Sequence, residues 1–76
     1  MSDPTPPVAA DCHAESAQPV VGRVASTATV DEARRLAGAQ IARVLKPGQM
    51  VTLEYREGRL NIDVDANNVI TRVRCG

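Results

Sequence analysis

The chain contains almost no large aromatic side chains from which a hydrophobic core could be built. It has 76 residues with no tryptophan and no phenylalanine, and Tyr55 is its one aromatic residue. A chain of this length buries a smaller fraction of its surface than a larger protein does. At ~25 cal/mol per Å² of buried apolar surface, a thin core of Ala, Val, Leu and Ile barely offsets the entropy lost on folding. We therefore expect one small domain that needs a further stabilising element.

Two cysteines near opposite ends of the chain are the candidates for that element. A bridge between Cys12 and Cys75 would close a loop of roughly sixty residues and contribute ~4 kcal/mol in the chain-entropy model. The alternative is a pair of unpaired thiols in a cytoplasmic protein. Because persistent disulfides occur in oxidising compartments, a bridged protein would be secreted or periplasmic, its signal peptide already removed. We expect the bridge, and the cytoplasm stays open as the alternative compartment.

The charge balance and the apolar pattern argue against several classes of function. Nine basic and nine acidic side chains give a net charge of zero, whereas nucleic-acid binding needs a basic patch. No apolar run reaches the ~20 residues needed to span a membrane. Residues 1–11 are rich in proline and alanine and lack the apolar stretch of a signal peptide. We expect them to form a disordered tail ahead of a single domain at residues 12–76.

A short helix is predicted to begin at Thr29. Its hydroxyl can cap the first amides of the helix, and Glu32 three residues later completes a capping box. Apolar residues then follow at helical spacing. Gly38 is suited to the left-handed conformation that ends many helices. Residues 12–26 show little periodicity, and no regular element is assigned to them.

Three segments are predicted to form strands, at residues 40–45, 59–65 and 69–74. The first ends at the turn signal Pro47-Gly48, and the last two are joined by a turn at residues 66–68. The middle segment alternates apolar and polar residues, which is typical of a half-buried strand with Leu60, Ile62 and Val64 on its buried face. We expect an α+β fold in which a single short helix packs on a small mixed sheet.

No residue pattern typical of an enzyme or a metal site is found. The single histidine, His13, lies beside Cys12 next to the expected tail, where a nucleophile pair would have no cleft. Residues 63–74 begin like a calcium loop, but Asn68 stands where glycine is needed and Arg74 where a bidentate glutamate belongs. Two cysteines and one histidine do not supply the four spaced ligands of a zinc site. We expect no enzymatic activity, no metal and no cofactor.

The segment at residues 48–59 is the strongest candidate for a functional loop. It is an apolar-to-charged run between two predicted strands, with Leu53 near its middle. Loops that carry function are usually held by a rigid scaffold. The same pattern also fits a solvated connection with one exposed leucine, which is ordinary. From the residues alone, both interpretations stay open.

Several spaced motifs resemble those of a known inhibitor family. They are Pro47-Gly48, Val51-Thr52, Tyr55-Arg56, Arg59-Leu60-Asn61 and the ending Ile70-Thr-Arg-Val-Arg-Cys75-Gly76. With these motifs, residues 12–76 are similar to the fungal elastase inhibitors and their bacterial relatives, peptidase inhibitor family seventy-eight. The layout also resembles the potato inhibitor I family of serine-protease inhibitors. The first of these families pairs an N-terminal cysteine with the C-terminal one, which also implies the Cys12–Cys75 bridge.

The resemblance implies a serine-protease inhibitor that binds as a substrate would. A long exposed loop at residues 49–56 would enter the protease cleft, with Leu53–Glu54 as the scissile bond. Leu53 suits the pockets of chymotrypsin-, elastase- or subtilisin-like enzymes, so one such protease is the implied partner of a monomeric inhibitor. The implied contact residues are Val51, Thr52, Leu53, Glu54, Tyr55 and Arg56.

The resemblance also implies which residues support this loop. Arg59 matches a supporting arginine of the family, with Thr52 and Glu54 as its partners. Asn61 stands where a second supporting arginine is often found, and Arg74 from the last strand is the candidate to replace it. The disulfide is expected to fix the scaffold from its ends without touching the loop. Two other functions stay open: a module that binds a non-protease partner, and a structural protein of the cell envelope.

Overall fold

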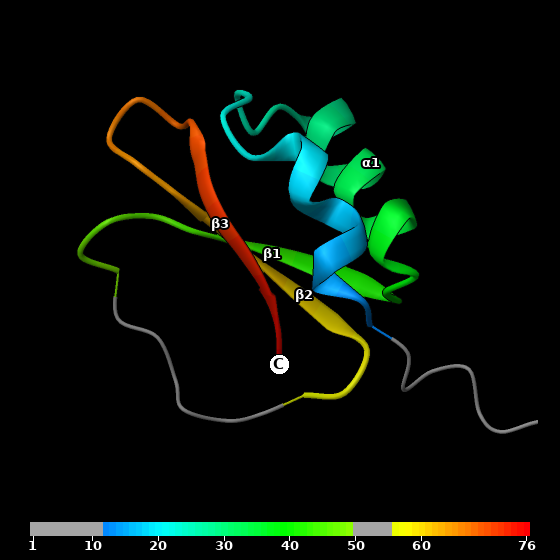
Figure 1. Cartoon of the computed structure of the whole chain (residues 1–76). Helices are drawn as coiled ribbons and strands as arrows, with labels where there is room; N and C mark the ends of the chain where they lie inside the picture. The colour runs from blue at the N-terminus through cyan, green and yellow to red at the C-terminus, as the bar shows by residue number, and fades with distance from the viewer. Residues whose placement is uncertain (1–11, 50–55) are drawn as a thin grey trace, which may run out of the picture.

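The computed structural model describes residues 12–49 and 56–76, so the predicted tail at residues 1–11 lies outside the described residues. Two helices pack against one face of a single sheet (Figure 1), which confirms the predicted α+β class. The elements follow in the order η2, a 3-10 helix (Ala14–Val20), α1 (Thr27–Ala37), β1 (Ile41–Leu45), β2 (Arg59–Val64) and β3 (Ile70–Cys75).

The three described strands form a mixed sheet in the order β1-β2-β3. β1 pairs with β2 in parallel, from Ile41 beside Arg59 to Leu45 beside Asp63. β2 pairs with β3 in an antiparallel hairpin. Because parallel neighbours run in the same direction, a chain that leaves β1 must return to the opposite end of the sheet before β2 begins. Residues 46–58 make this return, and they include the predicted inhibitory loop at residues 49–56.

The hydrophobic core lies between the sheet and the two helices. The buried face of β2 carries the alternating apolar residues that the sequence predicted, and η2 and α1 cover them mainly with alanine and valine. All buried core residues in the described part of the chain are aliphatic, in agreement with the composition. The fully buried ones are Ala17, Val20, Ala33, Ala37, Leu60, Ile62 and Ile70.

The second face of β2 is also buried, and here the prediction of a half-buried strand is wrong. Asn61 is 1% exposed, although alternation placed it on a solvated face, and Arg59 on the same face is 7% exposed. β2 is the central strand of the sheet, so side chains from β1 and β3 flank this face as well as the other. A polar layer therefore lies on the side of the sheet away from the helices.

The helix α1 begins earlier than predicted because a different hydroxyl caps it. Ser26 Oγ accepts a hydrogen bond from the N–H of Thr29 at 3.2 Å. Thr29 lies inside the first turn, so the predicted capping box with Glu32 is wrong, and Glu32 instead pairs with Arg23 at 3.0 Å. The predicted end is confirmed, since Gly38 follows the last turn in the left-handed conformation with φ 70°.

The helix η2 was not predicted from the sequence. This helix buries Ala17 and Val20 against the core, and the N–H of His13 just before it donates to the carbonyl of Ala37 at 2.8 Å. A 3-10 helix does not repeat at 3.6 residues, so a search for α-helical periodicity misses it. Pro19 inside the segment also argues against an ordinary helix interior.

We expect Ser26→Ala to lower the free energy of unfolding by about 1 kcal/mol, because it removes the side-chain acceptor for the first turn of α1. Ser16→Ala is the matched control, since Ser16 is an exposed serine in η2 and its replacement should leave the stability nearly unchanged. Urea denaturation followed by circular dichroism measures both. Equal losses in the two variants would contradict the assignment of Ser26 as the cap.

Candidate functional site

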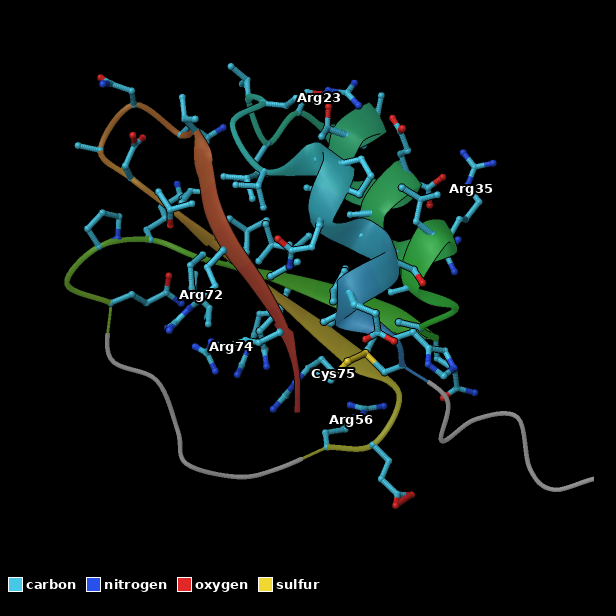
Figure 2. The ribbon with its side chains drawn as sticks, viewed as in Figure 1. Arg23, Arg35, Arg56, Arg72, Arg74 and Cys75 are labelled. Atoms are coloured by element: carbon cyan, nitrogen blue, oxygen red, sulfur yellow. A yellow bond between two sulfur atoms is a disulfide. The ribbon has the colours of Figure 1, made fainter. Side chains whose placement is uncertain are left out.

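The face of the sheet opposite the helices carries arginines from all three strands. We call it the arginine face. In Figure 2, Arg72 and Arg74 of this face lie on the side of the sheet away from Arg35 on α1. The strand register brings its members together, since residue 43 pairs with 61, 61 with 74, and 63 with 72. Its members are Arg43, Arg59, Asn61, Asp63, Arg72 and Arg74.

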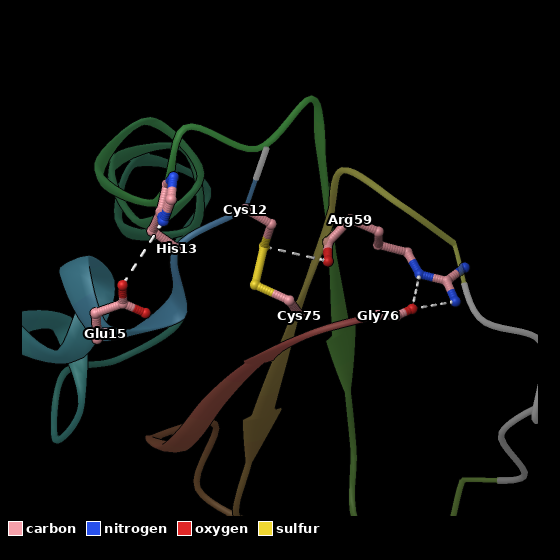
Figure 3. Close-up of a disulfide and its surroundings, with 6 residues drawn as sticks. All are labelled: Cys12, His13, Glu15, Arg59, Cys75 and Gly76. Carbon is pink, nitrogen blue, oxygen red and sulfur yellow. Dashed lines mark hydrogen bonds and ion pairs between the residues drawn. A yellow bond between two sulfur atoms is a disulfide. The ribbon is translucent and has the colours of Figure 1, made fainter. Parts of the chain in front are cut away.

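Arg59 attaches the start of β2 to the end of β3. Its Nε and Nη2 donate to the main-chain oxygen of Gly76 at 3.1 and 2.8 Å (Figure 3). The same oxygen accepts the N–H of Arg56 at 3.3 Å, and the N–H of Gly76 donates to the carbonyl of Arg59 at 3.0 Å. We call these four hydrogen bonds the Gly76 clamp. The clamp holds Arg56, the residue that directly follows residues 50–55.

The Cys12–Cys75 disulfide lies beside the Gly76 clamp. The predicted bridge is confirmed, with the two Cα atoms 6.0 Å apart. Cys12 Sγ lies 3.6 Å from the carbonyl oxygen of Arg59 (Figure 3), a packing contact because a disulfide sulfur carries no proton to donate. Cys75 directly precedes Gly76. The bridge therefore connects to Arg56 through the Gly76 clamp, whereas the sequence analysis expected it to act only on the scaffold.

Asn61 holds an arginine that the sequence analysis did not single out. Its Oδ1 accepts a hydrogen bond from Nε of Arg43 at 3.1 Å, and the two residues are register partners in the parallel ladder. An arginine is thus present next to position 61, supplied by β1. The available signal was the polar Arg43 between the apolar Ala42 and Val44, since such alternation places it on the face opposite the core.

Arg74 is bound to Asp63. Its Nε and Nη2 donate to the two carboxylate oxygens at 3.2 and 3.4 Å, and Arg72 donates from Nε to the same carboxylate at 3.0 Å. Burial alone would raise the pKa of Asp63, but the hydrogen bonds from Arg74 and Arg72 outweigh it and hold that pKa below its usual range. One carboxylate thus faces two guanidinium groups, which leaves the arginine face positively charged.

Most of the predicted contact residues lie outside the described part of the chain. These are Val51, Thr52, Leu53, Glu54 and Tyr55, and Arg56 is the described member of the set. The expected hydrogen bonds from Arg59 to Thr52 and Glu54 involve the same undescribed residues. Both expectations therefore stay predictions.

Within residues 12–49 and 56–76, no group of three or more His, Cys, Asp or Glu side chains could hold a metal ion. The rejected calcium-like segment has other hydrogen bonds: Asp65 Oδ1 accepts the N–H groups of Asn67 and Val69 at 2.8 and 2.9 Å, which closes the hairpin turn. A helix long and apolar enough to cross a membrane is also absent from these residues.

Comparison with known proteins identifies the family. The model of the Peptidase inhibitor I78 family matches residues 12–76. The chain belongs to this family. Its members are peptidase inhibitors, which confirms both the family resemblance found in the sequence and the prediction that the chain is not an enzyme.

Two curated relatives of this I78 chain are elastase inhibitors from fungi. AFLEI from Aspergillus flavus and AFUEI from Aspergillus fumigatus are each 54% identical to it over 33 residues, 43% of this chain. The matched segment spans 48% of the first relative and 38% of the second. The solved structure of elastase inhibitor AFUEI (crystal form II) matches with a TM-score of 0.66 and 34% identity, over 82% of this chain and 85% of that chain.

We expect acid to destabilise this I78 chain partly through Asp63. Because its pKa in the folded state is held below the unfolded value, its ion pairs stabilise the fold above the unfolded pKa, and this contribution is lost as the pH falls through the folded pKa. The urea midpoint of Asp63→Asn should therefore fall less steeply than that of the wild type between about pH 5 and pH 2. Glu57→Gln, at an exposed carboxylate, should keep the wild-type slope. If the urea midpoint of Asp63→Asn falls with pH as steeply as that of the wild type, Asp63 is not a source of the acid sensitivity.

Proposed function

We propose that the chain inhibits serine proteases by presenting residues 49–56 to the active-site cleft as a substrate would, with the Leu53–Glu54 bond at the catalytic serine. The observation that carries this proposal is the Gly76 clamp, in which Arg56 and Arg59 both donate to one main-chain oxygen beside the disulfide. Tight binding without turnover needs a segment that loses little freedom on association. Membership of a peptidase inhibitor family supports the same function.

The described residues at both ends of the proposed segment are held by hydrogen bonds. At its start, the Lys46 N–H donates to Gln49 Oε1 at 3.0 Å, and the Gln49 N–H donates to the carbonyl of Lys46 at 3.1 Å. This closes a turn in which Gly48 has φ 75°. At its end, the Gly76 clamp holds Arg56. One end is thus fixed by a turn that follows β1, and the other is fixed to Gly76 after β3. A scaffold that holds both ends in this way favours a binding loop of defined shape.

Leu53 is the proposed specificity residue. An aliphatic side chain suits the pockets of chymotrypsin-, elastase- or subtilisin-like enzymes, whereas a trypsin-like pocket contains a carboxylate that favours a cation. The names of the fungal relatives describe elastase inhibitors, which supports an elastase-like target. We place the protein as a monomer in an oxidising compartment, secreted or periplasmic, because its disulfide would persist there.

We expect the oxidised protein to inhibit chymotrypsin, an elastase and a subtilisin in a one-to-one complex and to leave trypsin active. Leu53→Asp should abolish inhibition, because a carboxylate is costly to bury in an apolar pocket. Titration of residual protease activity on a chromogenic peptide measures both results. Leu36→Asp is the matched control, at an exposed leucine on α1, and should inhibit as the wild type does. Unchanged inhibition by Leu53→Asp would refute Leu53 as the contact residue.

We expect Arg59→Ala to turn the inhibitor into a better substrate. The variant loses both side-chain donors of the Gly76 clamp, and charge-assisted hydrogen bonds are each worth ~1.5–3 kcal/mol, so cleavage at Leu53–Glu54 should be at least about tenfold faster. Mass spectrometry of timed digests measures the rate. Arg35→Ala, which removes an exposed arginine on α1, is the control. If folded Arg59→Ala is cleaved no faster than this control, the support role is wrong.

A second candidate function is binding of an anionic, non-protease partner through the arginine face. The observation that favours it is the excess of arginines over the single carboxylate of Asp63 on this face. In this case the oxidised protein would neither inhibit nor be cleaved by any of the four proteases. Strong self-association in that experiment would instead favour a structural protein of the cell envelope.

A further inference from the structure

The outer edge of β1 has no neighbouring strand in the described part of the chain. β1 lies at one end of the strand order, with β2 as its neighbour. The N–H of Ile41 donates to the carbonyl of Gly58, just before β2, so in the parallel ladder alternate residues of β1 bond to β2. The main-chain groups of Ala42 and Val44 therefore point outward. Such a row of donors and acceptors is a template for a strand from another chain.

An apolar groove lies beside this edge, between β1 and α1. Ala25, Val30, Ala42 and Val44 line it, and all four are half-buried residues packed against the core. Ala42 and Val44 share the helix side of the sheet, because Arg43 between them lies on the arginine face. The core is thus open along β1. A strand added beside β1 would place every second side chain in this groove.

The two charged residues that line the groove compensate each other. Asp31 and Arg34 form an ion pair at 3.1 Å, and Arg34 Nη1 also donates to the carbonyl of Ala39 at 3.1 Å. A charged side chain entering the groove would lose water and find both of these groups already bonded. The groove therefore favours apolar side chains.

Arg43 creates the opposite preference on the other face of the same edge. Among the described residues, its side chain donates to a neutral group, from Nε to Asn61 Oδ1 at 3.1 Å. The Asp63 carboxylate, by contrast, faces Arg72 and Arg74. The charge of Arg43 thus lacks a carboxylate partner in the described part of the chain. An acidic side chain opposite Arg43 on an added strand would form a stabilising cross-strand pair.

We propose that the edge of β1 binds an extended segment of another protein in which apolar residues alternate with acidic ones. The segment would add a strand to the sheet, with its apolar side chains in the groove and its carboxylates beside Arg43. This inference goes beyond the proposed inhibition and does not depend on it.

A second copy of this chain fits the edge less well. Antiparallel pairing of two β1 strands would place both arginine faces on the same side of the joined sheet. The two Arg43 side chains would then lie opposite or diagonal to each other, and like charges in such positions destabilise a strand pair. Charge complementarity therefore selects an acidic partner.

A capped peptide of about seven residues that alternates valine with glutamate is the probe, because this length pairs along the whole of β1. We expect it to bind with a Kd below about 1 mM. A peptide with lysine in place of glutamate should bind at least about tenfold more weakly. Fluorescence anisotropy of the labelled peptides measures both. Equal binding of the two peptides, or no binding of the glutamate peptide, would overturn the proposal.

Main-chain N-methylation distinguishes strand addition from apolar contact alone. One modified peptide is methylated at the valine nitrogens and the other at the glutamate nitrogens. Because alternate N–H groups of a strand face opposite edges, one modified peptide should lose at least about tenfold in affinity and the other should bind as before. Loss at the valines indicates antiparallel pairing, and loss at the glutamates indicates parallel pairing. Equal effects of the two modifications would contradict strand addition.

Arg43→Glu tests the charge on the protein side. The Asn61 amide can donate to the new carboxylate, so the fold should be kept, which circular dichroism checks. We expect this variant to prefer the lysine peptide at least about tenfold, whereas Arg35→Glu, at an exposed arginine on α1, should keep the wild-type preference. An unchanged preference in Arg43→Glu would refute the proposed pairing. If sedimentation shows a dimer whose Ala42 and Val44 amides are protected from hydrogen exchange, a second copy occupies the edge and the proposal is wrong.

Discussion

The parallel pairing of β1 with β2 is the constraint on which the rest of the structure depends. It requires the chain to travel back along the sheet, so residues 46–58 form a long connection whose two ends lie at opposite ends of the strands. The helices cover one face of the sheet, and the arginine face lies on the other side. β3 then pairs antiparallel to β2 and brings Gly76 beside Arg59. The position of the proposed inhibitory segment in the chain and its anchor at Gly76 thus both follow from one strand arrangement.

The disulfide has two consequences in this arrangement. Cross-linking residues 63 apart in the sequence stabilises the fold by about 4 kcal/mol in the chain-entropy model, which matters in a domain whose core is small and aliphatic. It also ties Cys12, next to η2, to Cys75, next to the Gly76 clamp. If the chain is cut at Leu53–Glu54, the two cysteines fall on different fragments. The bridge would then keep both fragments in one molecule. The pairing of β1 with β2 would also join them, because these strands lie on different fragments.

The sequence predicted the fold class, the strands and the disulfide because each depends on a local pattern or on a spacing of motifs. It misplaced the start of α1 because Ser26 and Thr29 both match the preference for a capping hydroxyl, and tertiary packing decides between them. Pro19 concealed η2. Alternation cannot tell that both faces of a central strand are buried, and the contact of Arg43 with Asn61 depends on a register between strands far apart in the sequence. The contact residues from Val51 to Tyr55 remain predictions.

The central claim is that the chain binds a protease as a substrate does, and that its two fragments stay in place after cleavage at Leu53–Glu54. The most direct test is long incubation with an elastase, followed by mass spectrometry with and without a reductant, starting once from the intact protein and once from the purified cleaved form. We predict a single cleaved species, heavier by one water, that separates into residues 1–53 and 54–76 only after reduction. Both starting points should converge on the same ratio of intact to cleaved protein, since the fixed ends favour resynthesis of the bond. Complete conversion to several fragments, with no intact protein regenerated, would contradict the account.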